Sequence, residues 1–266
     1  MTITAGIDVG AKSTRAALLE DGRTILATEV SATGFDYEKA GRETYAKALA
    51  AAGLAADRIS YITATGFGRY RISFRNLNVT DITANARGAQ FLFPETRSAV
   101  DVGAGNARAF RLDERGKVLK FRSTEKCAAG GGGFLEKIAY YTGVGLDDLG
   151  RTALESTHPV NISTICSVLA ESEVINLVTQ EVPMVDILMG AHESIAGRVL
   201  VTLKQVGVEP EVTLTGGLVL NAAFVRALET KLGVKVNTSP RLFYAGALGA
   251  AILGHVRWMK KSATAG

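Results

Sequence analysis

Two stretches of the chain open with the same pattern of apolar residues. Residues 3–9 and 99–102 are apolar runs that end in Asp-Val-Gly, which predicts buried strands. A glycine turn and two further strand-like segments follow each run, at 15–19, 24–30, 108–112 and 117–122. Because turn residues bound every segment, each stretch is expected to form a three-stranded meander.

Helical periodicity follows each meander. Helices are expected at 37–52, at several places between 134 and 207, and at 244–259. Further strands are predicted at 59–65, 211–215 and 234–237. Alternating strands and helices predict an α/β fold.

The chain divides near residues 94–98 into two similar lobes. We expect an N-terminal lobe over 1–96 and a C-terminal lobe over 97–266. The second lobe is larger, so it is expected to carry an insertion, and both cysteines fall in it. This division is compatible with a C-terminal helix that packs back on the first lobe.

An internal repeat supports the two-lobe interpretation. Residues 8–21 align without gaps on residues 101–114, and seven of the fourteen positions are identical. One residue later in register, Gly22 matches Gly116. Each copy therefore places an aspartate, Asp8 or Asp101, in the first turn of its meander.

The two turns have the chemistry of a phosphate site. Glycine exposes backbone N–H groups that form an anion nest, and an aspartate at a strand end can hold Mg²⁺ through water. We expect Asp8 and Asp101 to be the catalytic and Mg²⁺-holding carboxylates. The turn residues expected to bind the cofactor are Gly10, Ala11, Lys12, Ser13, Thr14, Gly103, Ala104 and Gly105.

A third glycine turn lies at Gly216-Gly217. A predicted strand runs into these glycines, and a helix is expected to start near Asn221. Such a turn leaves room for a flat adenine and its ribose against the backbone, so Gly216, Gly217 and Asn221 are candidate nucleotide contacts. The alternative is an ordinary strand-to-helix turn.

The chain has two cysteines, too few for a disulfide scaffold. Cys127 precedes four consecutive glycines and a helix expected from about Gly133, and Cys166 falls in the first turn of another helix, with Ser163 as its expected cap. Helix N-termini favour thiolates. Two thiolates from each of two chains would supply the four ligands of a 4Fe-4S cluster. The alternative is a pair of buried, small apolar side chains.

Composition excludes several classes of protein. Glycine accounts for 29 of 266 residues, and a net charge of +4 with scattered basic residues leaves no nucleic-acid footprint. The uncharged run at 242–254 has 13 residues, whereas a membrane span needs about 20. The first residues lack the basic and apolar regions of a signal peptide, so we expect a cytoplasmic protein without a membrane partner.

The three glycine turns together resemble the superfamily of sugar kinases, actin and the 70-kDa heat-shock chaperones. The segments concerned are 8–14, 101–106 and 216–217. The resemblance covers essentially the whole chain. It implies two ribonuclease-H-like lobes that close over Mg·ATP.

The cysteine segments resemble a narrower family. The stretches 127–136 and 166–176, with the Thr-Gly-Gly turn, are similar to the activators of 2-hydroxyacyl-CoA dehydratases and to the ATPase subunits of ATP-dependent benzoyl-CoA reductase. Residues 1–8 and 192–203 look most like the shorter reductase ATPase subunit. In that family one 4Fe-4S cluster lies between two subunits, and by match its ligands here are Cys127 and Cys166.

The resemblance also implies a reaction and partners. ATP hydrolysis in the family drives a low-potential electron from ferredoxin to a CoA-ester reductase. The second ATPase subunit is either a paralogue or another copy of the chain. Gly131, Gly132 and Glu136, which follow Cys127, are expected to contact the nucleotide.

One departure from the family pattern affects the second turn. The activators have Asp-Ile-Gly-Gly-Gln-Asp where this chain has Asp-Val-Gly-Ala-Gly-Asn at 101–106. A carboxylate and a glutamine amide that could position water or Mg²⁺ are missing. We expect this subunit to bind nucleotide but hydrolyse it weakly, relying on a paralogous partner. A homodimeric dehydratase activator, a small-molecule kinase and a non-catalytic actin-like or chaperone-like ATPase are the alternatives.

Overall fold

The computed structural model describes residues 1–124, 131–164 and 167–264, and the chain forms two compact units. The first unit comprises Met1–Thr96, Leu112–Val118 and Pro240–Gly266. The second unit comprises Arg97–Arg111 and Leu119–Ser239.

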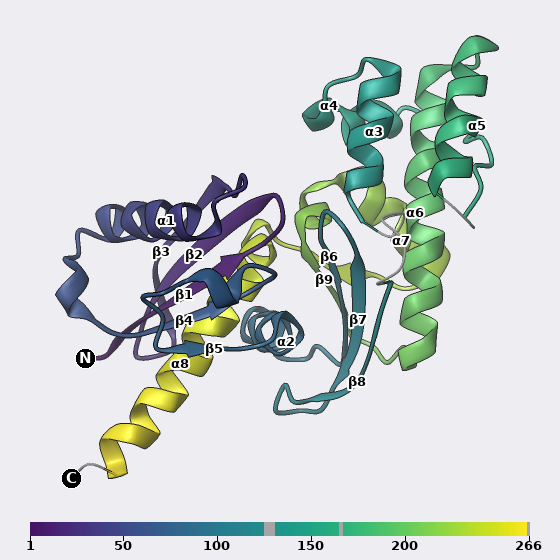
Figure 1. The fold of residues 1–266 in the computed structure, drawn as a ribbon. Helices are drawn as coiled ribbons and strands as arrows, with labels where there is room; N and C mark the ends of the chain where they lie inside the picture. The colour runs from purple at the N-terminus through teal and green to yellow at the C-terminus, as the bar shows by residue number, and fades with distance from the viewer. Residues whose placement is uncertain (125–130, 165–166, 265–266) are drawn as a thin grey trace. The chain divides into compact units, whose positions relative to one another are not determined.

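The first unit is built on a five-stranded sheet with the order β3-β2-β1-β4-β5 (Figure 1). Its strands are β1 (Ile3–Val9), β2 (Ser13–Glu20), β3 (Thr24–Ala32), β4 (Ile59–Thr65) and β5 (Leu77–Asn78). Every residue of β1 is buried, as expected of a central strand that is covered on both faces. β1 pairs antiparallel with β2 and parallel with β4.

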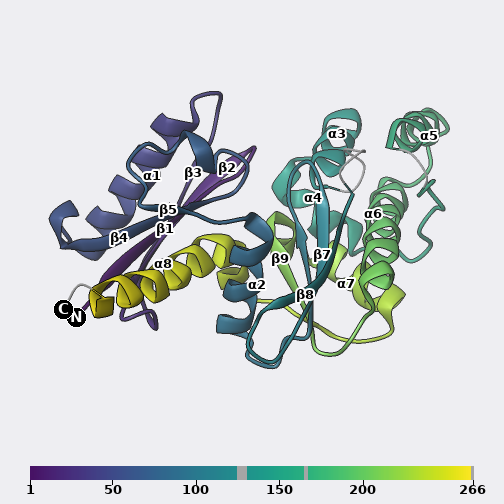
Figure 2. The same ribbon diagram turned by 60° about the horizontal axis from the view of Figure 1, so that its bottom comes forward.

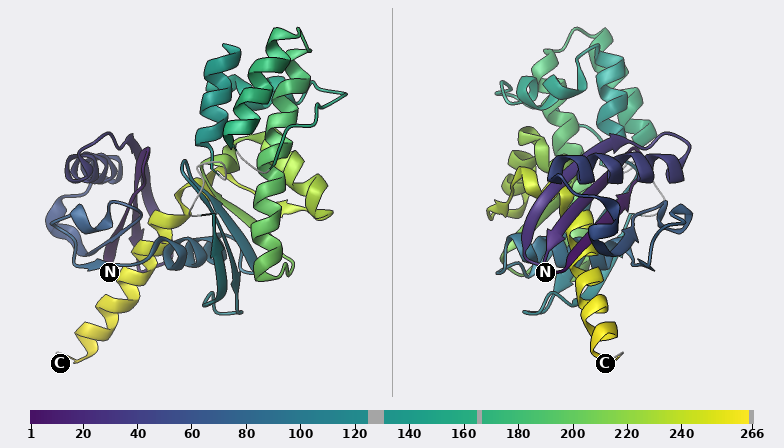
Figure 3. Two further views of the ribbon diagram at one scale, coloured as in Figure 1. Left: turned by 45° about the vertical axis from the view of Figure 1, so that its right-hand side comes forward. Right: turned by 90° about the vertical axis from the view of Figure 1, so that its left-hand side faces the viewer.

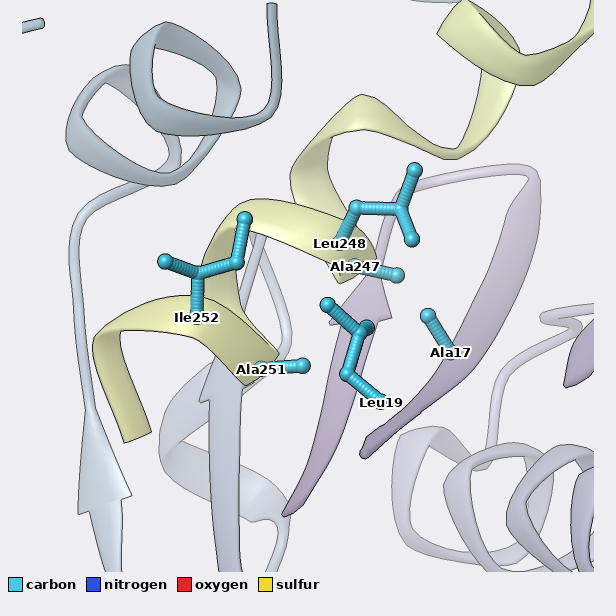
Figure 4. Packing of buried hydrophobic residues seen from close by; sticks show 6 residues of the cluster. All are labelled: Ala17, Leu19, Ala247, Leu248, Ala251 and Ile252. Atoms are coloured by element: carbon cyan, nitrogen blue, oxygen red, sulfur yellow. The ribbon is translucent and has the colours of Figure 1, made fainter. Parts of the chain in front are cut away.

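Helices cover both faces of this sheet. The side chains of β2 alternate between the two faces, so they contact a different helix on each. Ala16 and Leu18 pack with Ala48 of α1 (Tyr37–Ala52). Ala17 and Leu19 instead meet a row of residues on α8 (Ala245–Thr264), and Figure 4 shows this cluster. The α8 members of the cluster are Ala247, Leu248, Ala251 and Ile252.

Small residues let α8 lie close to its neighbours. α2 (Asp81–Leu92) packs on α8, and a Cβ added to Gly88 would overlap the carbonyl oxygen of Ala245. A Cβ added to Gly249 would likewise overlap the carbonyl oxygen of Ala84. The two helix backbones therefore touch, and larger side chains would push them apart.

The second unit repeats the same sheet topology. Its order is β10-β9-β6-β7-β8, so β6 takes the place of β1, with an antiparallel neighbour β7 and a parallel neighbour β9. The strands are β6 (Ser98–Val102), β7 (Ala107–Leu112), β8 (Val118–Ser123), β9 (Val212–Gly216) and β10 (Val236–Asn237). The internal repeat in the sequence is therefore a repeat of structure.

The second unit also holds a group of helices beyond its sheet (Figures 1 and 3). α3, α5 and the long α6 pack on one another, and α4 packs on α6 (Figure 2). The helices of this unit are α3 (Gly133–Thr142), α4 (Leu146–Ala153), α5 (Ser167–Thr179), α6 (Met184–Val206) and α7 (Ala222–Leu232). Short 3-10 turns lie at Ala56–Arg58, Arg69–Arg71, Gly217–Leu220 and Pro240–Tyr244.

The predicted strands and the helix at 37–52 are present, with ends shifted by a few residues in several of the strands. Among the α-helices and strands of the described residues, α2 and the two-residue strand β5 were not predicted. The expected cap of α5 by Ser163 depends on residues 165–166, which lie outside the described residues. Within the described ranges, no helix has the length and apolar character needed to cross a membrane.

Candidate functional site

The first glycine turn joins β1 to β2 and is closed by its own backbone. The N–H of Gly10 donates to the carbonyl of Ser13 at 3.1 Å. Thr33, directly after β3, braces the turn, because its hydroxyl donates to the Gly10 carbonyl at 2.9 Å and its N–H donates to the Lys12 carbonyl at 2.9 Å. The Thr14 hydroxyl bonds that of Thr33 at 2.9 Å. The predicted turn residues 10–14 are thus held in one conformation.

Asp8 lies near the end of β1, two residues before Gly10, and is almost fully buried, with 6% of the residue exposed. Arg15 on β2 pairs with it, Nη1 to Oδ2 at 3.3 Å, and the guanidinium lies 4.0 Å from the centroid of the Phe243 ring. A Cβ at Gly66 would lie 2.5 Å from Asp8 Oδ1, and one at Gly246 would lie 2.5 Å from Oδ2. Glycines therefore flank the carboxylate on both sides, where any side chain would fill the space.

The second turn repeats this arrangement in the other unit. Gly103 N–H donates to the carbonyl of Asn106 at 3.0 Å, and Arg108 Nη1 lies 3.4 Å from Asp101 Oδ2. The Thr215 hydroxyl donates to Asp101 Oδ1 at 3.3 Å. A Cβ at Gly216 would lie 2.6 Å from that same oxygen. Both predicted carboxylates thus have an arginine on the second strand and a glycine where the fourth strand ends.

A Thr-Gly pair lies where the fourth strand of each unit ends, and the sequence predicted only the glycine of the second unit's pair as part of a site. Asp8 pairs in parallel register with Thr65, and Asp101 pairs with Thr215. The next residues, Gly66 and Gly216, have φ of +85° and +86°, in the left-handed region that favours glycine. Gly216 was predicted, whereas Gly66 was missed. The matching Thr-x-Thr-Gly at 63–66 and 213–216 is the signal that could have found it.

The glycines after Cys127 contact the second turn itself. Gly132 N–H donates to the Gly103 carbonyl at 2.9 Å, and Gly133 N–H donates to the Ala104 carbonyl at 2.8 Å. A Cβ at Gly131 would lie 2.5 Å from the Ala104 carbonyl oxygen. The close approach of two backbones therefore requires glycine here. Contact of Gly131, Gly132 and Glu136 with a nucleotide remains a prediction, as does that of Gly105.

At the third turn, Asn221 is a helix cap. Its Oδ1 accepts from Phe224 N–H at 3.0 Å and caps α7, while Nδ2 lies 3.0 Å from His192 Nε2. His192 Nδ1 lies 2.7 Å from the Leu188 carbonyl, so Nδ1 carries the proton and Nε2 accepts from Asn221. Burial lowers the pKa of His192 to about 4, so the ring is neutral at pH 7. Adenosine binding by Gly216, Gly217 and Asn221 stays a prediction.

Both predicted cluster ligands, Cys127 and Cys166, lie outside the described residues. Within the described part of the chain, no three His, Cys, Asp or Glu residues gather as a metal site. The described structure does include the flanks of both segments, from Gly131 onward and up to Thr164.

The family model and the relatives that match this chain agree with one another. The model of the BadF/BadG/BcrA/BcrD ATPase family matches residues 5–254. One of the subunits of benzoyl-CoA reductase from Thauera aromatica is 40% identical, in an alignment that covers 98% of this chain and 95% of that subunit. The activator of lactoyl-CoA dehydratase of Anaerotignum propionicum is 38% identical, and its alignment covers 97% of this chain and 99% of the activator.

Solved structures agree with these relatives. Component A of (R)-2-hydroxyglutaryl-CoA dehydratase of Acidaminococcus fermentans has a TM-score of 0.94 at 33% identity, covering 97% of this chain and 100% of that one. The activator of 2-hydroxyisocaproyl-CoA dehydratase of Clostridium difficile, solved with bound ADPNP, has a TM-score of 0.93 at 32% identity, covering 99% and 98%. A hexokinase of Thermus thermophilus shares the fold alone, with a TM-score of 0.53 at 18% identity, covering 96% and 99%. The predicted fold class is confirmed.

Burial of a neutral His192 makes folding stability depend on pH. Its pKa is about 4 when folded and about 6.5 when unfolded, so the unfolded chain binds the extra proton. The stability it contributes is complete above pH 6.5 and is lost as the pH falls toward 4, by about 3 kcal/mol at most. Chemical denaturation of the wild type between pH 7 and 4 should show this loss.

His192→Gln should flatten the pH dependence in that window, at some cost in stability at pH 7. The matched control is His158→Gln, because His158 is exposed. The interpretation fails if His192→Gln keeps the wild-type slope of unfolding free energy against pH.

Proposed function

Because this chain belongs to the BadF/BadG/BcrA/BcrD ATPase family, we propose that it uses Mg·ATP hydrolysis to deliver low-potential electrons to a CoA-ester reductase. The electrons would come from ferredoxin, and a 4Fe-4S cluster held jointly by this chain and a second ATPase subunit would supply the one-electron carrier. The acceptor is benzoyl-CoA reductase, in the anaerobic breakdown of aromatic compounds. The match to the family model also confirms, at the level of the family, the resemblance noted in the sequence.

The duplicated carboxylate turn is the observation that carries the nucleotide proposal. Asp8 and Asp101 each end a buried strand beside a backbone glycine turn, and each faces a left-handed glycine across the parallel pair. The buried Thr65 hydroxyl has no hydrogen-bond partner among the described residues. A relative with this fold was solved with a nucleotide analogue. These features fit a hydrated Mg²⁺ and phosphate oxygens.

The residues of the first turn have distinct roles in this proposal. Lys12 supplies a cation, and Ser13 and Thr14 supply hydroxyls beside the backbone amides of Gly10 and Ala11. Arg15 holds the Asp8 carboxylate in place through its 3.3 Å ion pair. When bound, Mg²⁺ neutralises the charge that develops on the transferred phosphoryl group. Gly103, Ala104 and Gly105 serve the phosphates from the second turn.

The donor set fits a shared iron–sulfur cluster. Thiolates are the ligands of 4Fe-4S clusters, and a chain with two cysteines supplies half of the four that one cluster needs. The cluster supplies a one-electron carrier. Cys127 and Cys166 of this chain would bind it, and the same pair from the second subunit would complete it.

The identity of the second subunit separates two versions of the proposal. Identities of 40% to a reductase subunit and 38% to a dehydratase activator do not favour either strongly. The altered turn at 101–106 favours a paralogous partner and therefore the reductase. A homodimeric activator of a 2-hydroxyacyl-CoA dehydratase is the second candidate, and the TM-score of 0.94 to a dehydratase component supports it.

Removing the carboxylate of the first turn should abolish most of the ATP hydrolysis that this subunit itself performs. Asp8→Asn keeps the size of the side chain but removes the charge that holds hydrated Mg²⁺, so kcat should fall about 100-fold or more. Phosphate release by the complex with the partner's own site disabled measures the turnover of this subunit alone. Asp57→Asn, an exposed aspartate in a 3-10 turn, is the matched control and should retain full activity. Full turnover by Asp8→Asn would remove Asp8 from the site.

The second turn predicts an unequal pair of ATPase subunits. With the partner's own site disabled, this chain should bind Mg·ADPNP but turn over ATP slowly, because Gly105 and Asn106 stand where the activators have a glutamine amide and a second carboxylate. Nucleotide binding by calorimetry and phosphate release measure the two properties separately. Full hydrolysis by this subunit in such a complex would overturn the idea.

The cysteines separate electron transfer from the other ATPase functions. Complex purified without oxygen should hold about four irons per pair of ATPase subunits, with an EPR signal that responds to ATP. Cys127→Ser should abolish that iron and electron transfer. A small-molecule kinase or an actin-like protein would keep its activity in Cys127→Ser. An iron-free wild type would exclude the cluster.

A further inference from the structure

A buried arginine joins the two segments that flank the cysteines. Arg198 lies on α6 with 8% of the residue exposed. Its Nε donates to the Thr164 carbonyl at 2.9 Å, and its Nη2 donates to the Ser163 carbonyl at 2.8 Å. The same guanidinium lies 5.0 Å from the centroid of the Phe134 ring. Thr164 precedes Cys166 by two residues, and Phe134 is the second residue of α3, the helix that follows Cys127.

Two further side chains hold the backbone of Ser163. Ser194, one turn before Arg198 on α6, donates its hydroxyl to the Ser163 carbonyl at 2.7 Å and accepts from Arg198 Nη2 at 3.0 Å. Glu173 on α5 accepts from the Ser163 N–H at 2.7 Å. Side chains from α5 and α6 therefore fix the segment just before Cys166.

On the other side, α3 is fixed to both the second turn and α5. Gly133 N–H, one residue before Phe134, donates to the Ala104 carbonyl. Further along α3, Lys137 Nζ pairs with Glu171 Oε1 on α5 at 2.8 Å, and this hydrogen bond raises the pKa of Lys137. The guanidinium of Arg198 therefore lies where the start of α3 meets the segment before Cys166.

We propose that Arg198 is a positioning residue for the two thiols, holding the segment before Cys166 against the first turn of α3. The inference rests on the proposed cluster function and assigns a task to a residue that touches neither cluster nor nucleotide. Arginine suits the task because its planar fork reaches two successive carbonyls while its face stacks on an aromatic ring. A lysine has one nitrogen centre and cannot make all of these contacts at once.

The test compares three variants in the complex purified without oxygen. Arg198→Met keeps the length of the side chain and loses every donor, Arg198→Lys keeps the charge and loses the fork, and Arg226→Met is the control. Arg226 lies in the same unit and also donates to a carbonyl, that of Leu154 at 3.2 Å. Thermal unfolding and circular dichroism check that each variant folds.

Cluster retention and thiol reactivity are the readouts. Arg198→Met should lose iron to a chelator about 10-fold faster than wild type, with a changed EPR line shape and midpoint potential. In iron-free protein, alkylation of Cys166 should accelerate by a similar factor. Arg198→Lys should fall between, and Arg226→Met should match wild type.

The outcomes separate this inference from the function on which it rests. If the wild type binds iron and a folded Arg198→Met shows wild-type iron loss, spectrum and alkylation, Arg198 has no positioning role. If the wild type binds no iron, the proposed cluster fails. A positioning role without a cluster would then still appear as faster alkylation of Cys166 in Arg198→Met. If Arg198→Met does not fold, Ser194→Ala, which removes one bond to the Ser163 carbonyl, should accelerate alkylation, and an unchanged rate overturns the proposal.

Discussion

The register between the first and fourth strands is the constraint on which both candidate phosphate turns depend. In each unit the parallel pair sets a carboxylate, Asp8 or Asp101, beside a threonine, and the glycine that follows it turns left-handed against that carboxylate. A Cβ there would lie 2.5 or 2.6 Å from an oxygen of the aspartate. A shift of one residue would turn each aspartate to the opposite face of its sheet. The glycines and the register thus specify each other.

Segments rich in large apolar residues made most of the fold predictable, whereas α2, whose buried residues are mostly small, was not predicted. Strands β1 and β6 are recognisable as apolar runs that end in the same tripeptide. α2 was missed because its buried face consists of Ala84, Asn85, Ala86, Gly88 and Ala89, which carry little hydrophobic signal. That face is small because the α8 backbone touches it. Close packing of backbones thus erases the periodicity from which helices are predicted.

The parts of the candidate site that are contiguous in sequence could be predicted. The parts that tertiary packing brings together could not. The turns after Asp8 and Asp101 are contiguous in sequence, so alignment of the repeat found them. Gly66 reaches Asp8 only through strand pairing, and Arg198 reaches residues 163–164 only through the packing of α6. Asn221, predicted from its place after a glycine turn, proved to be tied to His192 on another helix. Such contacts are set by tertiary packing, which no local pattern encodes.

The duplicated turns differ in the group that donates a hydrogen bond to the carbonyl of the first glycine. The Gly10 carbonyl accepts from the hydroxyl of Thr33, the residue that directly follows β3 of its own meander. The equivalent Gly103 carbonyl accepts from the N–H of Gly132, at the start of α3. The first turn is therefore braced by its own sheet, whereas the second is bonded to the helix that follows the Cys127 segment. A displacement of the second turn must stretch these bonds or move α3, and α3 in turn is paired with α5 through Lys137 and Glu171. The second copy of the repeat thus couples its glycine turn to the inserted helices. The equivalent bond of the first turn, from Thr33, stays within its own meander.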